Sequence, residues 1–353
     1  MDEALGISAY QQTTEEVERL GCLLSVFVPF ELAAHLMSQL SGLSVSASSL
    51  WNWVQVRGKQ AVEKVENQLR VLEAGEAIES EVLEATIAEM TLVMAADGVM
   101  VPLRPRVGTP RGQTVWQEVK VTVLARLGHH LTRTGKTVSR LYQRRLVAVL
   151  GSIEVLDPRL QLEALRQGLA SAPKVVWLSD GGKGFWRLYQ KYFAASAVAI
   201  LDFSHAAGHL WRAAAAWLDG RTSIARWCFE RWRHLLRHGG DYQLLRELTH
   251  LINRHDLPPS ALKTPVQVQR YLQRHRSHIR YQDFAQQEFP LGSGLVESAC
   301  KWLIQQRFKG VGMRWSEDSF NHLLHLRLAW VNQRFDNLFP DDAVMPKLLS
   351  PNP

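Results

Sequence analysis

Three acidic residues stand at positions where an α/β sheet would bring carboxylates together. Asp97 ends the apolar run of residues 91–96, Asp180 ends the run of residues 175–179, and a glycine follows each aspartate. Short apolar runs that stop at a turn signal predict buried strands. In open α/β sheets, catalytic groups follow the carboxyl ends of such strands. Glu297 stands early on an amphipathic helix after a Gly-Ser-Gly turn and could supply a third carboxylate from beside the sheet.

Three carboxylates that converge from different elements suit metal-dependent phosphoryl transfer. Mg²⁺ prefers carboxylate and water oxygens as ligands. Two ions that bridge a scissile phosphate activate the attacking oxygen and stabilise the leaving oxygen. We therefore predict that Asp97, Asp180 and Glu297 bind two Mg²⁺ ions, which Mn²⁺ can replace. Each residue taken alone has a simpler interpretation, because Asp-Gly is a common turn and Glu297 can pair with Lys301 on its own helix.

The segments around these carboxylates predict a mixed α/β sheet. Alternation at residues 118–126 and apolar runs at 146–150 and 197–202 predict three further strands. Helices are predicted at residues 158–169 and 185–193. Three consecutive strands can form an antiparallel meander, and strands joined through helices extend it with parallel pairs.

The first ninety residues predict helices only. A helix from residue 30 to 40 ends at Gly42, and Ser46 or Ser48 can cap a following helix that carries basic residues near position 59. Residues 31–59 therefore resemble a helix-turn-helix, although many helical hairpins share this pattern. A polar helix over residues 60–90 is expected to connect or dimerise the chain.

The positive charge of the chain is concentrated in one segment. The net charge is +7 over 353 residues, and residues 221–280 contain twelve Lys and Arg against four Asp and Glu. A concentrated basic segment predicts a polyanionic partner, because neutralising phosphates releases counterions. A solvated helical surface is the simpler interpretation. The tryptophans of this segment can stack on unpaired bases or fill its core.

Other bulk features exclude several classes of protein. No apolar run is long enough to span a membrane, and the acidic N-terminus does not resemble a secretory signal. Three scattered cysteines give neither a disulfide framework nor a metal-binding pair, which is typical of a reducing cytoplasm.

Several blocks of the sequence resemble successive blocks of bacterial insertion-sequence DDE transposases of the ISKra type. The most specific is Pro290-Leu-Gly-Ser-Gly-Leu-Val-Glu-Ser-Ala-Cys-Lys301, which continues into residues 307–316. The resemblance covers roughly residues 91–330, and its other blocks are residues 96–102, 119–123, 178–182 and 200–205.

The resemblance implies a ribonuclease-H-like fold interrupted by a helical insertion, with Asp97, Asp180 and Glu297 as the DDE triad. Asp202 and His205 match an Asp-x-x-His signature of related transposases. Ser179 stands where relatives often have glycine, and the N-terminal region is short for the family and lacks a Cys-x-x-Cys pair. The domains we expect are an N-terminal region (1–90), a catalytic core in two parts (91–205 and 290–335), a basic insertion (206–289) and a tail (336–353).

The basic residues near the triad and in the insertion are candidates for contacts with the DNA backbone. Such contacts supply affinity more than specificity. The candidates are Arg104, Arg106, Arg111, Arg231, Arg233, Arg237, Arg307, Lys309 and Arg314, with Trp315 as a stacking residue.

The function predicted from these features is DNA transposition. The chain would cut the ends of an insertion sequence and join them to target DNA, as a homodimer on double-stranded DNA in the bacterial cytoplasm near the nucleoid and away from any membrane. Two alternatives remain open, namely a domesticated DNA-binding protein without catalysis and a ribonuclease-H-like nuclease that cuts without joining.

Overall fold

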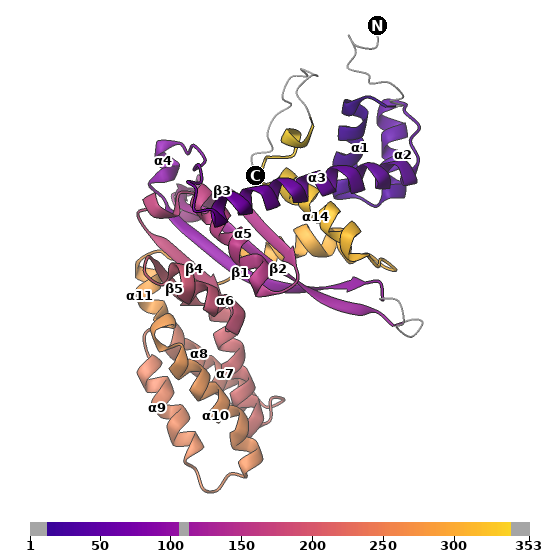
Figure 1. Ribbon diagram of the computed structural model, residues 1–353. Helices are drawn as coiled ribbons and strands as arrows, with labels where there is room; N and C mark the ends of the chain where they lie inside the picture. The colour runs from indigo at the N-terminus through magenta and orange to yellow at the C-terminus, as the bar shows by residue number, and fades with distance from the viewer. Residues whose placement is uncertain (1–12, 106–112, 340–353) are drawn as a thin grey trace.

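A five-stranded mixed sheet forms the centre of the computed structural model, which describes residues 13–105 and 113–339 (Figure 1). The strands lie in the order β3-β2-β1-β4-β5. Strands β1, β2 and β3 pair antiparallel, whereas β4 is parallel to both β1 and β5. This arrangement is the ribonuclease-H-like sheet expected from the sequence. The strand bounds are Thr91–Leu103 (β1), Val115–Leu131 (β2), Thr137–Leu150 (β3), Val175–Ser179 (β4) and Ala197–Leu201 (β5).

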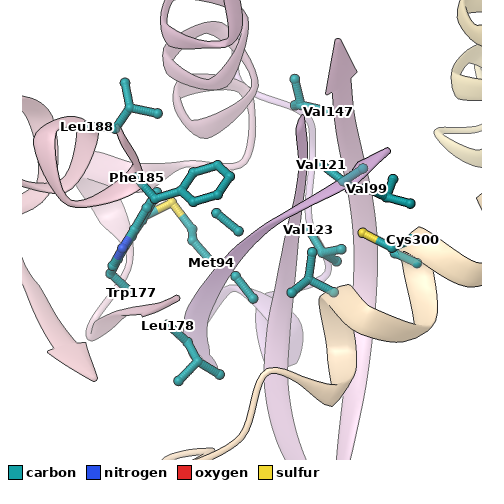
Figure 2. Packing of buried hydrophobic residues seen from close by; sticks show 14 of the residues in the cluster. Met94, Val99, Val121, Val123, Val147, Trp177, Leu178, Phe185, Leu188 and Cys300 are labelled. Atoms are coloured by element: carbon teal, nitrogen blue, oxygen red, sulfur yellow. The ribbon is translucent and has the colours of Figure 1, made fainter. Parts of the chain in front are cut away.

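Helices cover both faces of this sheet, which explains why its central strands are continuous apolar runs. All five residues of β4 are buried, and Trp177 is fully buried against Phe193. Figure 2 shows Phe185 on one side of the strands and Cys300 with Val121 on the other. The sheet is therefore the core on which all other elements are placed.

The first strand does not end at Asp97, as the sequence suggested, but runs on to Leu103. Residues 97–103 continue the antiparallel ladder with β2, in which Asp97 lies opposite Val121. The parallel ladder with β4 stops at the Ala96–Ser179 pair. The Asp-Gly pair thus marks the end of the parallel pairing and not a turn of the chain.

The glycine after Asp97 is explained by a close approach within the sheet. A Cβ atom at Gly98 would lie 1.9 Å from Glu118 Oε1 on β2. Glycine inside a strand often marks such a contact. The β2–β3 hairpin is also longer than predicted, because its outer half is largely exposed and carries no buried alternation that a sequence pattern could reveal.

The helices that follow the first three strands keep the predicted order, with shifted ends. A predicted helix over 158–169 is α5 (Ile153–Arg166), and the segment after Asp180 is α6 (Lys183–Leu188) continued by a π-helical turn, η3 (Tyr189–Phe193). The helix that carries Glu297 contains a π-helical turn as well. It comprises α12 (Gly294–Ala299), η5 (Cys300–Gln305) and α13 (Gln306–Phe308), and α14 (Glu317–Val331) follows.

Five helices stand between β5 and α12 in the chain. Figure 1 shows four of them, α7 to α10, as a bundle that projects from one end of the sheet. Helix α7 packs against α8 and α10, and α9 packs against α10. Their bounds are Phe203–Leu218 (α7), Ser223–Arg237 (α8), Asp241–Ile252 (α9), Pro259–Arg274 (α10) and Tyr281–Gln286 (α11).

The N-terminal helices are α1 (Glu15–Phe27), α2 (Phe30–Ser41), α3 (Ala47–Glu73) and the short α4 (Ala85–Ala88). Gly42 ends α2 with a φ of 71°, and the Ser46 side chain caps α3, as predicted. The division near residue 60 was wrong, because α3 is one helix that ends at Glu73. Its packing along α14 explains this continuity, since a Cβ at Gly58 would lie 2.6 Å from the His322 carbonyl oxygen.

Two buried arginines, one before and one on α14, join these N-terminal helices to the C-terminal helices of the described chain. Arg307 is 1% exposed and its Nε donates to the Ser25 carbonyl at 2.9 Å. Arg327 donates from Nε to the Leu303 carbonyl at 2.7 Å and from its other nitrogens to the Trp302 and Val26 carbonyls. Within the described ranges, no helix combines the length and apolar character needed to cross a bilayer.

Replacing Arg327 tests whether these contacts hold the N-terminal helices in place. Arg327→Met leaves three carbonyl acceptors without their donor, so we expect the free energy of unfolding to fall by about 3 kcal/mol. Arg221→Met is the matched control, since the Arg221 side chain is 90% exposed and its loss should change stability by less than about 0.5 kcal/mol. Urea denaturation followed by circular dichroism measures both. Equal stability of the two variants would contradict the assignment.

Candidate active site

The sheet places Asp97 and Asp180 next to each other. Each residue directly follows one member of the Ala96–Ser179 pair, the last pair of the parallel ladder between β1 and β4. The Asp180 carboxylate accepts a hydrogen bond from the Gly182 amide at 2.9 Å. The backbone carbonyl of Asp180 accepts a second hydrogen bond from Trp186 Nε1 at 2.7 Å. The backbone at Asp180 is therefore fixed from both sides, whereas Asp97 is fixed by its ladder with β2.

Glu297 reaches the same edge from the helix that packs on β1 and β2. It lies in the first turn of α12, and Ser293 Oγ donates to Glu297 Oε1 at 3.0 Å. The next turn places Cys300 between the strand and the helix, as Figure 2 shows. Burial, together with the charges of Asp97 and Glu297, raises the pKa of the Cys300 thiol to about 12. This thiol is therefore neutral. The effect of both charges on its pKa indicates that Asp97 and Glu297 lie close to it.

The charges of this edge repel one another. Burial raises the pKa of Asp97, a hydrogen bond from the Gly98 amide lowers it, and the nearby charges of Asp180 and Glu297 raise it further. His205 acts in the opposite direction. Asp97 is therefore within electrostatic reach of both Asp180 and Glu297.

The donor chemistry of this group fits magnesium. In phosphoryl-transfer sites, Mg²⁺ is bound through one or two carboxylates, and waters and substrate phosphates complete its shell. Among residues 13–105 and 113–339, no three His, Cys, Asp or Glu side chains form a group that could by themselves hold one ion. The couplings that the structure shows are those of Asp97 with Asp180 and of Asp97 with Glu297.

Asp202 and His205 have different positions relative to this group. The Asp202 side chain is 1% exposed and caps α7, accepting a hydrogen bond from the His205 amide. Its other oxygen accepts a hydrogen bond from the Ser293 amide, 91 residues further along the chain. The His205 side chain is half exposed, and its Nε2 lies 4.0 Å from Asp180 Oδ2.

These contacts form a chain that leads to the third carboxylate. Asp202 holds the Ser293 backbone, and the Ser293 hydroxyl holds Glu297. Asp202 is therefore a positioning residue. The sequence resemblance placed Asp202 in the Asp-x-x-His signature. Only the fold shows that its side chain holds the loop before α12.

Tyr271 on α10 is a neighbour of the site that the sequence did not indicate. Its ring stacks on His209 of α7, with the ring centroids 4.0 Å apart. Its hydroxyl is buried without a hydrogen-bond partner, and it lies so close to Gly181 that a Cβ there would be 2.3 Å away. Burial and the charges of Asp180 and Asp202 raise its pKa, so the hydroxyl keeps its proton and can donate it in a hydrogen bond. No spacing or motif connects this residue with Asp180, which lies on another element far away in the chain.

Two of the predicted DNA contacts are wrong, because the side chains are inside the protein. Arg307 binds the Ser25 carbonyl, as described above. Trp315 is 9% exposed and donates from Nε1 to the Phe308 carbonyl at 3.1 Å. Both residues connect elements in the interior, so neither is placed to meet a polyanion or a base.

Three other predicted contacts come together at the loop end of the β1–β2 hairpin. The Arg104 amide donates to the Trp315 carbonyl, and Arg104 Nε donates to the Arg314 carbonyl. Lys309 lies over the ring of Trp116, which is 52% exposed. Arg106 and Arg111, which the sequence also suggested, lie outside the described residues.

The predicted contacts of the insertion lie along α8. Arg231 pairs with Glu247 and Arg233 with Glu230, and Arg237 lies over the ring of Phe203. Trp232 of this helix is buried, whereas Trp227 is 64% exposed. One tryptophan of the helix is thus part of the core and another is on the surface.

Comparison with known proteins assigns no family to this chain. No family model and no curated protein matches the chain. Among solved structures, the chain is similar to the Drosophila P element transposase strand transfer complex, with 10% sequence identity and a TM-score of 0.38 over 94% of this chain and 95% of that one.

Neutralising Asp97 should stabilise the protein. Its pKa is raised above the ordinary 3.8, so the folded protein loses stability as the pH rises through the folded-state pKa. We expect Asp97→Asn to raise the free energy of unfolding by about 0.5–2 kcal/mol at pH 7, with a smaller gain near pH 4. Denaturation with urea across this pH range measures the effect. A loss of stability at pH 7 would show that the carboxylates do not repel one another.

Asp202→Asn tests the bridge between α7 and the loop before α12. An amide has one acceptor oxygen, so one of the two backbone amides loses its partner, and we expect a loss of about 1–3 kcal/mol. Asp219→Asn is the control, because Asp219 pairs only with the exposed Arg221 and should change stability by about 0.5 kcal/mol or less. Thermal unfolding distinguishes the two. A neutral Asp202→Asn variant would mean that the bridge contributes nothing.

Proposed function

We propose that this chain is a DNA transposase of the bacterial insertion-sequence DDE type, which cuts the ends of its element and joins them to target DNA. The observation that supports this most directly is the coupling of Asp97 with both Asp180 and Glu297 at one edge of a ribonuclease-H-like sheet. The resemblance of residues 91–330 to ISKra-type transposases points to the same activity.

The proposed cofactor is Mg²⁺, held by Asp97 and Asp180 on one side and by Asp97 and Glu297 on the other. When bound, two such ions would activate the attacking oxygen and stabilise the leaving oxygen of the phosphate. Asp97 and Asp180 are held by the strands, and Ser293 orients Glu297. His205 lies beside Asp180 on the exposed side and can donate a hydrogen bond to a phosphate oxygen there.

The chemistry requires no covalent enzyme intermediate. In the first step, a water oxygen forms a bond with phosphorus, and the bond from phosphorus to the 3′ oxygen of the element's end breaks, so that this oxygen leaves as a hydroxyl. In the second step, the oxygen of that hydroxyl forms a bond with a phosphorus of the target, and the bond from this phosphorus to the target's own 3′ oxygen breaks. The leaving oxygen takes up the proton that the attacking hydroxyl gives up. The number of phosphodiester bonds is unchanged in the second step, so no energy source is needed.

DNA would bind along basic residues that are exposed or partly exposed. The proposed backbone contacts are Arg104, Lys309 and Arg314 at the loop end of the β1–β2 hairpin, and Arg231, Arg233 and Arg237 along α8. The N-terminal helices α1 to α3 are the proposed region for recognition of the element's ends, and two copies of the chain would hold two ends together.

The decisive test is cleavage and joining of a labelled duplex that carries the end of the element, in the presence of Mg²⁺. We expect Asp97→Asn, Asp180→Asn and Glu297→Gln each to reduce cleavage by at least about 10²–10³-fold while DNA binding persists. Glu118→Gln is the matched control, since this nearby carboxylate is paired with Lys120 and should change cleavage only slightly. Ser293→Ala should give an intermediate loss of about 10–100-fold.

The products separate the proposal from its two alternatives. Joined molecules indicate a transposase, whereas cut but unjoined ends indicate a nuclease on the same fold. If all triad variants behave like the intact protein, the triad is wrong and the chain is a DNA-binding protein without this chemistry.

A further inference from the structure

A basic cleft opens directly beside Asp180. None of its charged residues belongs to the triad, the signature or the DNA contacts named above, and only Arg274 comes from the basic segment 221–280. It has a volume of about 580 Å³ and lies between the helix that follows Asp180 and helix α10 of the insertion. Most of its residues are positive or aromatic. They are Lys183, Trp186, Arg187, Lys191, Arg274 and His275, with the neutral Gln190 and with Gly181 at the end next to Asp180.

Three of the four cations stand at intervals of four residues along one helical segment. Lys183, Arg187 and Lys191 occupy α6 and η3, where a rise of 1.5 Å per residue separates neighbouring cations by about 6 Å. A row of positive charges on one side of a helix matches the row of phosphates along one nucleic-acid strand. Arg274 faces this row from α10.

The cations of this cleft are only partly neutralised. Arg187 lies 3.4 Å from Glu154 with both side chains well exposed, and Lys191 lies 2.9 Å from Asp157. Among the residues that the structure describes, no carboxylate pairs with Lys183 or Arg274. Exposed pairs of this kind contribute little, so they can be exchanged for phosphate contacts.

The floor of the cleft is rigid and is joined to Asp180. The Trp186 ring packs against His275 at 4.8 Å and against His278 at 4.5 Å, and its Nε1 donates to the Asp180 carbonyl. His275 is 6% exposed, and its Nδ1 has no hydrogen-bond partner. Buried polar atoms nearly always have a partner, so this nitrogen indicates that a water or a ligand atom completes the cleft.

We propose that this cleft binds the phosphate backbone of the DNA strand that leads into the active site, with Lys183, Arg187, Lys191 and Arg274 as its phosphate contacts. The proposal rests on the proposed function, because it names the path of the substrate to Asp180. It also gives the insertion a role, since Arg274 closes the cleft from α10 only when the bundle is docked on the sheet.

The test is the salt dependence of DNA binding, measured by fluorescence anisotropy of a labelled duplex that carries the element's end. One variant removes the four cations of the cleft, and a control removes four exposed cations elsewhere, so both lose the same net charge. The cleft variant is Lys183→Gln, Arg187→Gln, Lys191→Gln and Arg274→Gln, and the control is Arg133→Gln, Lys136→Gln, Arg140→Gln and Arg221→Gln.

We expect the plot of log K against log salt to become less steep by about 1 for each lost phosphate contact, hence by about 3–4 in the cleft variant. The control should retain nearly the slope of the intact protein. Circular dichroism shows whether both variants are folded, and because the substituted side chains are exposed, we expect them to be.

A second measurement maps the contact onto the DNA. Neutral methylphosphonates are placed singly at successive positions of the strand beside the cut. At phosphates that occupy the cleft, neutralisation should weaken binding of the intact protein severalfold and should not weaken binding of the cleft variant further, because both changes remove the same contact.

Each outcome has one meaning. If the cleft variant and the control lose equal affinity and slope while the intact protein binds and cuts, the cleft is not the path of the strand, although the proposed function stands. If the intact protein neither binds nor cuts the duplex, both proposals are overturned.

Discussion

The Asp202 carboxylate accepts hydrogen bonds from two backbone amides that lie on either side of the helical insertion. The His205 amide lies in the first turn of α7, and the Ser293 amide lies directly before α12. The buried Asp202 side chain therefore holds the two ends of the insertion together. The third acidic residue of the site comes from the far side of the insertion. The distance of Glu297 from the two aspartates therefore depends on the hydrogen bonds of Asp202. The Ser293 hydroxyl links them to Glu297 through its own hydrogen bond.

The placement of the other two carboxylates follows from strand pairing. Because β1 and β4 are parallel and their ladder ends at one residue pair, strand pairing alone places Asp97 and Asp180 side by side. Burial raises the pKa of Asp97, and the like charges that this geometry brings together raise it further. The carboxylates that would bind cations therefore repel one another by themselves. The strand ladders and buried contacts around the site hold them in place against this repulsion.

The insertion is more than a basic surface joined to the sheet. Helix α10 contributes Tyr271 beside Gly181, and the same helix faces α6 across the cleft through Arg274. A series of ring contacts through His209, Tyr271, His275 and Trp186 connects α7, α10 and α6. Movement of the bundle would therefore change the surroundings of the second aspartate directly, which couples the position of the insertion to the site.

The sequence by itself determined the sheet and its directions, because buried strands are apolar runs and the helices between them force parallel pairing. It also indicated the three acidic residues, since each stands at the boundary of such an element. Only the tertiary structure decided that β1 continues past Asp97, that Arg307 and Trp315 are interior, and that α10 borders the site. These features depend on contacts between residues far apart in the chain, and spacing along one segment carries no information about them.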